Sequence, residues 1–183
     1  MNLFIILFAS FSLFAGSFES QLLDLGQCLD VQKERVSNHM KISRARSRQV
    51  SDELKKVMDK YEEKFTITRV VSLLSSTLIQ DVCAEDPSSA PTAVGKIKGY
   101  RQKSSDLSTI DNDLYDLKYI AVNAGFDIND YLYGKGVDKN KLKNSLQRAA
   151  RKFDSDLRKI NSLAGKYKQS YPVPSCQKLA DRL

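Results

Sequence analysis

The most regularly patterned part of the chain is DKNKLKNSLQRAARKFDSDLRKINSLAGKYKQSY, residues Asp138–Tyr171. Its apolar residues recur at steps of three and four: Leu142, Leu146, Ala149, Ala150, Phe153, Leu157, Ile160, Ala164 and Tyr167. At about 100° of rotation per residue, such residues share one face of an α-helix, and a stripe roughly 100° wide is typical of a helix that faces a core. The stretch therefore predicts a long amphipathic helix, with Asp138 as its N-cap and Pro172 and Pro174 at its end.

Positive charge forms a second pattern on the same predicted helix. A row at steps of four and seven comprises Lys141, Arg148, Lys152, Lys159 and Lys166, and a basic cluster in the first helical region adds Lys41, Arg44 and Arg48. The whole chain has a formal net charge of +7 and a pI near 9.2. A partner attracted at long range should therefore be anionic, such as a sulfated glycan, a nucleic acid or an anionic membrane. The competing interpretation is that these cations are only the solvated backs of helices.

Three further helical regions precede this stretch. Residues 21–64 carry a nearly heptad apolar seam, with a kink or break expected near 43–50, where Ser43 and Ser47 take seam positions. Residues 66–83 contain an uncharged run that predicts a buried helix, with a buried strand as the alternative because several residues are β-branched. Residues 93–124 form either one helix or two divided near 104–106, with a seam of Leu107, Ile110, Leu114, Leu117 and Ala121.

Four helices with short connections predict an all-α fold, an up-down bundle of about four long amphipathic helices in a single domain over 18–183. Only 8 Gly and 4 Pro in the chain also favour helices over turn-rich β structure. In that order, the start of the first helix and the C-terminal tail share one end of the bundle. The connection 123–137 is expected at the opposite end.

The cysteines are Cys28, Cys83 and Cys176, an odd number. In a secreted chain this predicts one disulfide and one remaining thiol, or a dimer through the odd cysteine. The predicted bundle places Cys28 and Cys176 at the same end and favours that pairing, while the other pairings stay open.

The first residues predict a secretory signal peptide over 1–17. Leu3 to Ala15 is apolar and uncharged, and the small residues Ala15, Gly16 and Ser17 follow it. The run is shorter than the ~20 residues that span a bilayer. The alternative is an uncleaved anchor, since no Lys or Arg precedes the run. We expect a secreted, extracellular protein without a transmembrane segment after cleavage.

Catalytic and metal-binding patterns are weak in this sequence. His39 is the only histidine, and its place beside Met40 in a helical region predicts a partnered residue at the edge of the core. Zinc sites need clustered Cys and His, which three dispersed cysteines do not supply. We therefore expect a binding protein and no enzyme, cofactor or metal site.

Two other features suggest alternative modes of binding. The aromatic residues Phe126, Tyr131 and Tyr133 lie in the glycine-containing connection 123–137, where they either contact an extracellular protein partner or fold back to plug the bundle end. The uncharged helix at 66–83 suggests a carrier whose bundle encloses a small hydrophobic, lipid-like ligand.

Overall fold

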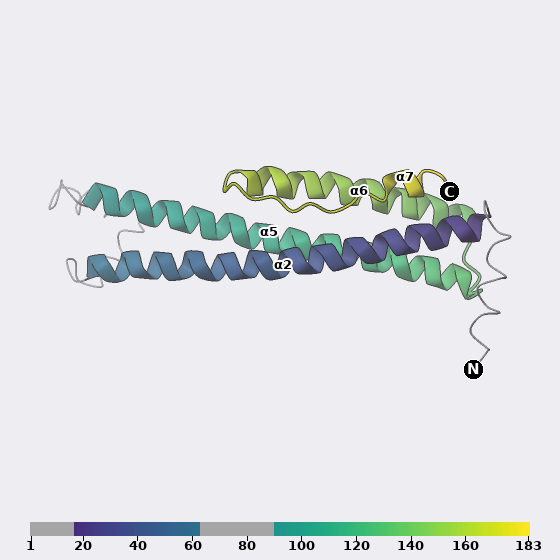
Figure 1. The fold of residues 1–183 in the computed structure, drawn as a ribbon, viewed down its shortest axis with the longest axis horizontal. Coiled ribbons are helices and arrows are strands. Elements are labelled where there is room, and N and C mark those ends of the chain that lie inside the picture. The colour runs from purple at the N-terminus through teal and green to yellow at the C-terminus, as the bar shows by residue number, and fades with distance from the viewer. Residues whose placement is uncertain (1–16, 63–89) are drawn as a thin grey trace, which may run out of the picture. The chain divides into compact units, whose positions relative to one another are not determined.

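The computed structural model describes residues 17–62 and 90–183. This part of the chain is all-α, with helices α2 (Phe18–Glu62), α5 (Ala90–Leu132), α6 (Lys139–Gly165) and the short α7 (Gln177–Ala180), as Figure 1 shows. The described helices pack up and down, and Cys28 is joined to Cys176. The predicted fold class is thus confirmed. The signal peptide, the helix at 66–83 and Cys83 lie outside the described residues.

The two long helices that begin the described chain are uninterrupted. α2 runs through 43–50, and α5 runs through 104–106 as a single helix. The apolar seam of α2 survives its polar patch because Ser43 is small enough to be fully buried on it and Val50 resumes it at 2% exposure. The expected interruption at either point is therefore not found.

The chain divides into two compact units, one of residues up to Met40 together with Asn112–Leu183, the other of Lys41–Asp111. The second unit pairs the later part of α2 with the earlier part of α5. Its core contains Val50, Val94, Ile97, Leu107 and Ile110. Arg44 links the two helices there through its Nε, which lies 3.2 Å from each carboxylate oxygen of Asp111. The single domain over 18–183 stays a prediction.

In the first unit, α2 and α6 run in the same direction and α5 runs opposite to both. At one end, the ring of Phe18 packs against Tyr131 at 5.4 Å, and the Lys139 amine lies 4.3 Å from the same ring. At the other end, His39 contacts Tyr171 at 5.3 Å between ring centroids. The connection after α5 thus shares an end with the start of α2, which corrects the sequence-based topology. The sequence-based topology placed three bundle-length helices, at 21–64, 66–83 and 93–124, before this connection. In the structure, α5 itself returns to the start of α2.

The apolar seam of α6 is confirmed as the face that packs into the core. Its buried residues are Leu142, Leu146, Ala150, Phe153, Leu157, Ile160 and Ala164. Asp138 is the N-cap, with its Oδ1 accepting a hydrogen bond of 2.8 Å from the backbone N–H of Lys141. This bond satisfies one of the donors that a helix start leaves without an intrahelical acceptor.

α6 ends at Gly165, well before the prolines that were expected to stop it. The chain reverses through Lys168, which has a φ of 55°. The side chain of Asn161 then accepts from the backbone N–H of Tyr171 at 2.6 Å and donates to its carbonyl at 3.3 Å. Tyr171 is 1% exposed, so burial of this ring and the hydrogen bonds to its backbone account for a helix that is shorter than its pattern predicts.

The remaining C-terminal residues 166–183 form a strap that runs back along α6 (Figure 1). Gln32 of α2 donates to the carbonyl of Pro174 at 2.8 Å. Cys176 follows with its disulfide to Cys28, the two Cα atoms 5.9 Å apart. The favoured pairing is confirmed, and it closes because the strap returns to α2.

α5 extends to Leu132, so most of the connection predicted at 123–137 is helical. Ala121, Ala124 and Ile128 continue the buried seam at 2–3% exposure. Burial of this seam outweighs the cost of about 1 kcal/mol that a glycine such as Gly125 imposes inside a helix. Neither described range contains a helix with the length and hydropathy needed to cross a membrane.

Candidate functional site

The face of α6 opposite its seam is strongly cationic. α6 contains eight Lys or Arg and only two Asp. Six of its cations are exposed on the side away from the core and define the cationic back of α6: Lys141, Arg148, Arg151, Lys152, Arg158 and Lys159. Lys166, also predicted from the sequence, is exposed just past the end of the helix. The sequence-predicted row on this helix is therefore a surface feature.

Asp156 partly neutralises the middle of this surface. Its two carboxylate oxygens accept from Lys152 at 2.6 Å and from Lys159 at 2.9 Å. The hydrogen bond from Lys152 is the main cause that holds the pKa of Asp156 below its ordinary value, and the same bond raises the pKa of Lys152. On neighbouring α5, burial and then the charge of Asp116 raise the pKa of Asp113. The two lysines thus serve the fold as well as the surface.

Beyond these lysines, the back of α6 contains a hollow of about 340 Å³ lined by Asn144, Gln147, Arg148 and Arg151. Arg148 donates from its Nε to the carbonyl of Asn144 at 3.2 Å. The strap borders this region, because Gln147 donates to the carbonyl of Ala180 at 3.2 Å. Every side chain that lines the hollow can donate hydrogen bonds, which makes it suited to an anionic group.

The basic residues predicted on the first helix lie in the second compact unit. Lys41, Arg44 and Arg48 are exposed on α2, and Arg44 is paired with Asp111. A joint surface with α6 stays a prediction.

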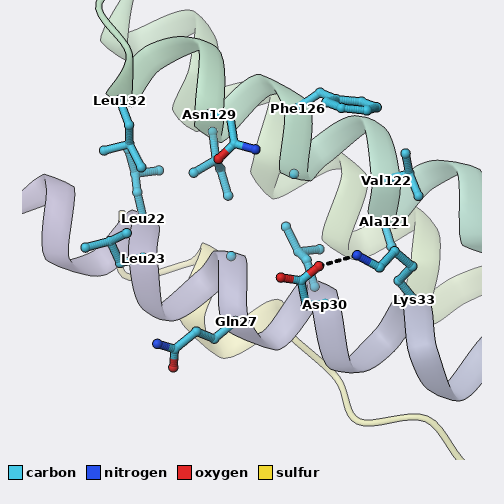
Figure 2. A pocket seen from close by; sticks show the side chains of 14 residues that line it. Leu22, Leu23, Gln27, Asp30, Lys33, Ala121, Val122, Phe126, Asn129 and Leu132 are labelled. Atoms are coloured by element: carbon cyan, nitrogen blue, oxygen red, sulfur yellow. Dashed lines mark hydrogen bonds and ion pairs between the residues drawn. The ribbon is translucent and has the colours of Figure 1, made fainter.

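A separate groove lies between α2 and α5 in the first unit, with a volume of about 320 Å³. Figure 2 shows its two walls, with Leu22 and Leu23 of α2 near Leu132 of α5 at one end, and Val122 and Phe126 of α5 toward the other end. Its polar rim includes the ion pair between Asp30 and Lys33, together with Gln27 and Asn129. The floor is apolar, as a site for a hydrophobic group requires.

Two glycines keep this groove open. Gly26 on α2 and Gly125 on α5 both line it. A Cβ built on either residue would meet no heavy atom within 4 Å. Neither glycine is therefore needed for close packing of the two helices, and the space above each is solvent or ligand space.

A second hollow of about 480 Å³ continues the groove toward the start of α2. It shares Leu23, Asn129 and Leu132 with the groove and adds Tyr133, Ser17, Ser20 and Glu19. Together they form an elongated, mostly apolar depression with a polar edge.

The aromatic candidates divide between the two roles that the sequence left open. Phe126 and Tyr131 lie on α5 and not in a loop, while Tyr133 directly follows the helix. Tyr131 packs edge to face on Phe18 and closes the end of the bundle, whereas Phe126 and Tyr133 are 62% and 80% exposed.

Sequence reasoning missed two exposed aromatics that precede them on α5. Tyr115 and Tyr119 are 58% and 60% exposed. With Val122, Phe126 and Tyr133 they recur at steps of three, four and seven, a second apolar stripe beside the buried seam. The spacing was readable in the sequence, but apolar residues at helical spacing predict a buried face and do not reveal a second stripe that stays exposed.

His39 has the structural role expected of it. Its Nε2 lies 3.0 Å from the carbonyl oxygen of Pro172, and its ring contacts Tyr171 edge to face. Over 17–62 and 90–183, no three His, Cys, Asp or Glu side chains gather as a group that could hold a metal ion. Comparison of the chain with protein-family models, with curated proteins and with solved structures finds no match. The chemistry of its own surfaces is therefore the basis for a functional assignment.

Proposed function

We propose that this chain is a secreted binding protein that engages an anionic macromolecule through the cationic back of α6. The observation that supports this proposal is the segregation of charge on one helix. Its eight basic residues are opposed by two aspartates, and its apolar residues face the core. An anionic chain lying along the helix would meet lysines and arginines without displacing any part of the fold.

The length of this surface suits a polymer better than a single small anion. Lys141 and Lys159 are separated by roughly 27 Å along the helix at a rise of about 1.5 Å per residue. Charges so far apart are screened from each other at physiological salt, where the Debye length is about 8 Å. A polyanion contacts several of them at once and releases its own condensed counterions, so binding should weaken steeply with salt.

Secretion and a non-catalytic role belong to the same proposal. The disulfide between Cys28 and Cys176 is of the kind that persists in oxidising compartments. The only imidazole, that of His39, is engaged by the strap, which supports a binding role over acid–base chemistry.

The direct test is retention on immobilised heparin over a salt gradient, using Lys141→Glu combined with Arg148→Glu. These two side chains contact no acidic group in the described residues, so reversal should leave the fold intact. Lys152 and Lys159 are poorer choices, because their reversal would leave Asp156 among like charges.

The matched control reverses Lys96 and Lys98, two exposed lysines of α5 in the second unit, and changes the net charge equally. The proposal expects the α6 variant to elute at clearly lower salt than the control. If both variants elute together, retention follows net charge alone and the back of α6 is not the binding surface.

The groove between α2 and α5 favours a second candidate function, the carriage of a small hydrophobic ligand. Two glycines inside long helices cost about 1 kcal/mol each relative to alanine, and here no neighbouring atom requires them. An apolar ligand lying over Gly26 and Gly125 would occupy the space that the absence of side chains leaves there. The ligand would sit in a surface groove, not in the closed interior that the sequence suggested.

Native mass spectrometry of the secreted protein tests this candidate. A bound ligand appears as an adduct of a few hundred daltons that is lost on denaturation, the size that fills a typical pocket. Gly125→Leu should remove the adduct by filling the groove, and the α6 charge variant should retain it. A clean mass for the wild-type protein would refute the carrier function.

A further inference from the structure

The hollow on the back of α6 has features that the rest of the cationic surface lacks. It is a depression of about 340 Å³ whose lining consists of two arginines and two amide side chains, Asn144, Gln147, Arg148 and Arg151. Lys141 lies about two turns before Arg148 on the same face, so the hollow has a further cation in line with it. A concave, donor-rich wall distinguishes a site for a discrete group from a merely charged face.

Neither of the two arginines uses all of its hydrogen-bond donors within the described fold. Arg148 engages a carbonyl of its own helix through Nε, and its two terminal nitrogens have no acceptor within the part of the chain described. Arg151 lies 3.5 Å from a carboxylate oxygen of Asp181, longer than the 2.7–2.9 Å usual for a charge-assisted pair. Both guanidinium groups therefore retain donors for a ligand.

We propose that this hollow seats a sulfate group of a sulfated glycan chain, with Arg148 and Arg151 donating to its oxygens and Asn144 contributing an amide donor. The inference rests on the proposed function and specifies its ligand. Planar guanidinium forks match the oxygens of a tetrahedral anion in pairs, which lysine amines do not. The space exceeds that of one sulfate, so part of the attached sugar ring also enters.

A glycan fits this surface better than a nucleic acid does. Single strands are held largely by stacking of bases on aromatic side chains, and the back of α6 has no aromatic residue. The disulfide agrees with an oxidising compartment, where sulfated glycans are the polyanions of cell surfaces and matrix. A phosphate polymer is retained as an outcome of the test.

Asp181 competes with the ligand for Arg151. Its Oδ1 also accepts a hydrogen bond of 2.7 Å from Gln177, which an asparagine at the same position would preserve. Asp181→Asn should thus remove a competing charge without undocking α7. An exposed pair of this kind contributes up to about 1 kcal/mol, so affinity for the sulfated ligand should rise by up to about fivefold.

The experiment is calorimetric titration of the full chain with a heparin tetrasaccharide and with the same tetrasaccharide after desulfation. Arg148→Lys combined with Arg151→Lys keeps the net charge and removes the guanidinium forks. The matched control replaces Arg35 and Arg101, exposed arginines outside the cationic back of α6, by lysine. We expect about tenfold weaker binding for the first pair, because a lysine amine cannot donate a paired fork of hydrogen bonds to the sulfate oxygens, and less than a twofold change for the control.

The outcomes separate this inference from the proposed function. If the sulfated ligand binds the wild type and the Arg148/Arg151 variant equally, the hollow is not the sulfate site, although a polyanion surface survives. If neither the tetrasaccharide nor long heparin chains bind, both proposals fail. If single-stranded DNA of equal charge binds as tightly and loses affinity equally in the variant, the ligand is a phosphate polymer and the glycan assignment is overturned.

Discussion

Replacement of Gly26 and Gly125 by alanine should stabilise the protein. Both glycines lie inside long helices, where alanine is favoured by about 0.8–1 kcal/mol per position, partly because glycine leaves the unfolded chain more freedom to lose. A Cβ at either site meets no heavy atom within 4 Å, so no packing penalty offsets this gain. The double variant should therefore gain about 1.5–2 kcal/mol.

Thermal and urea denaturation followed by circular dichroism measure the effect. For a chain of about this length, 1 kcal/mol corresponds to roughly 2–4 °C in Tm, so the double variant should melt about 3–8 °C higher. The matched control is Gly134→Ala. This glycine also has open space around it, but its φ is +71°, a conformation that costs an L-residue about 1–2 kcal/mol.

The control should therefore lose stability while the two helical variants gain it. A loss of stability in Gly26→Ala or Gly125→Ala would mean that another part of the molecule occupies the space above that glycine. The groove would then not exist as an open site, and the carrier function would lose its structural basis along with this prediction.

Three further variants test the interactions that hold the C-terminal strap and the α6 surface in place. Replacing Cys28 and Cys176 by serine opens a loop with a sequence separation of 148. On the chain-entropy model this should lower the free energy of unfolding by up to about 5 kcal/mol. Equal urea midpoints for the variant and the wild type would contradict this expectation. Asn161→Ala removes the hydrogen-bond partner of the buried Tyr171 backbone and should cost about 1–3 kcal/mol, measured by urea denaturation; a cost near zero would show that the strap docks without it. Because the pKa of Asp156 is lowered in the folded state, chiefly by a lysine hydrogen bond, its contribution to stability is present at neutral pH and is lost as the pH falls below about 4 and through the lowered pKa. Asp156→Asn should accordingly lower Tm more at pH 7 than at pH 3, and an equal loss at both pH values would refute this linkage.

The seam of α6 shows what periodicity predicts well. Seven of its nine predicted apolar residues are buried, because the face that a helical residue occupies depends only on its position in the sequence. The same rule identified the cationic row opposite the seam. It did not reveal that Asp156 would engage both Lys152 and Lys159, since rotamer choice on a helix surface depends on every neighbour at once.

Periodicity was less informative at the ends of the helices. α6 ends at Gly165 because Tyr171 finds a buried site and Asn161 binds its backbone. α5 continues through Gly125 because Ala124 and Ile128 have a core to enter. In both cases the burial of residues in the core outweighed the tendency of prolines and glycines to set the helix end.

Local spacing and composition therefore suffice to predict the all-α class, the buried faces of the helices and the positive charge on α6. Three features come from long-range packing instead: the C-terminal strap turns back to join Cys176 to Cys28, α5 returns to the start of α2, and Gly26 and Gly125 line the same groove. These features require residues distant in the chain to meet. Their meeting depends on the packing of whole helices against one another, which no local pattern encodes.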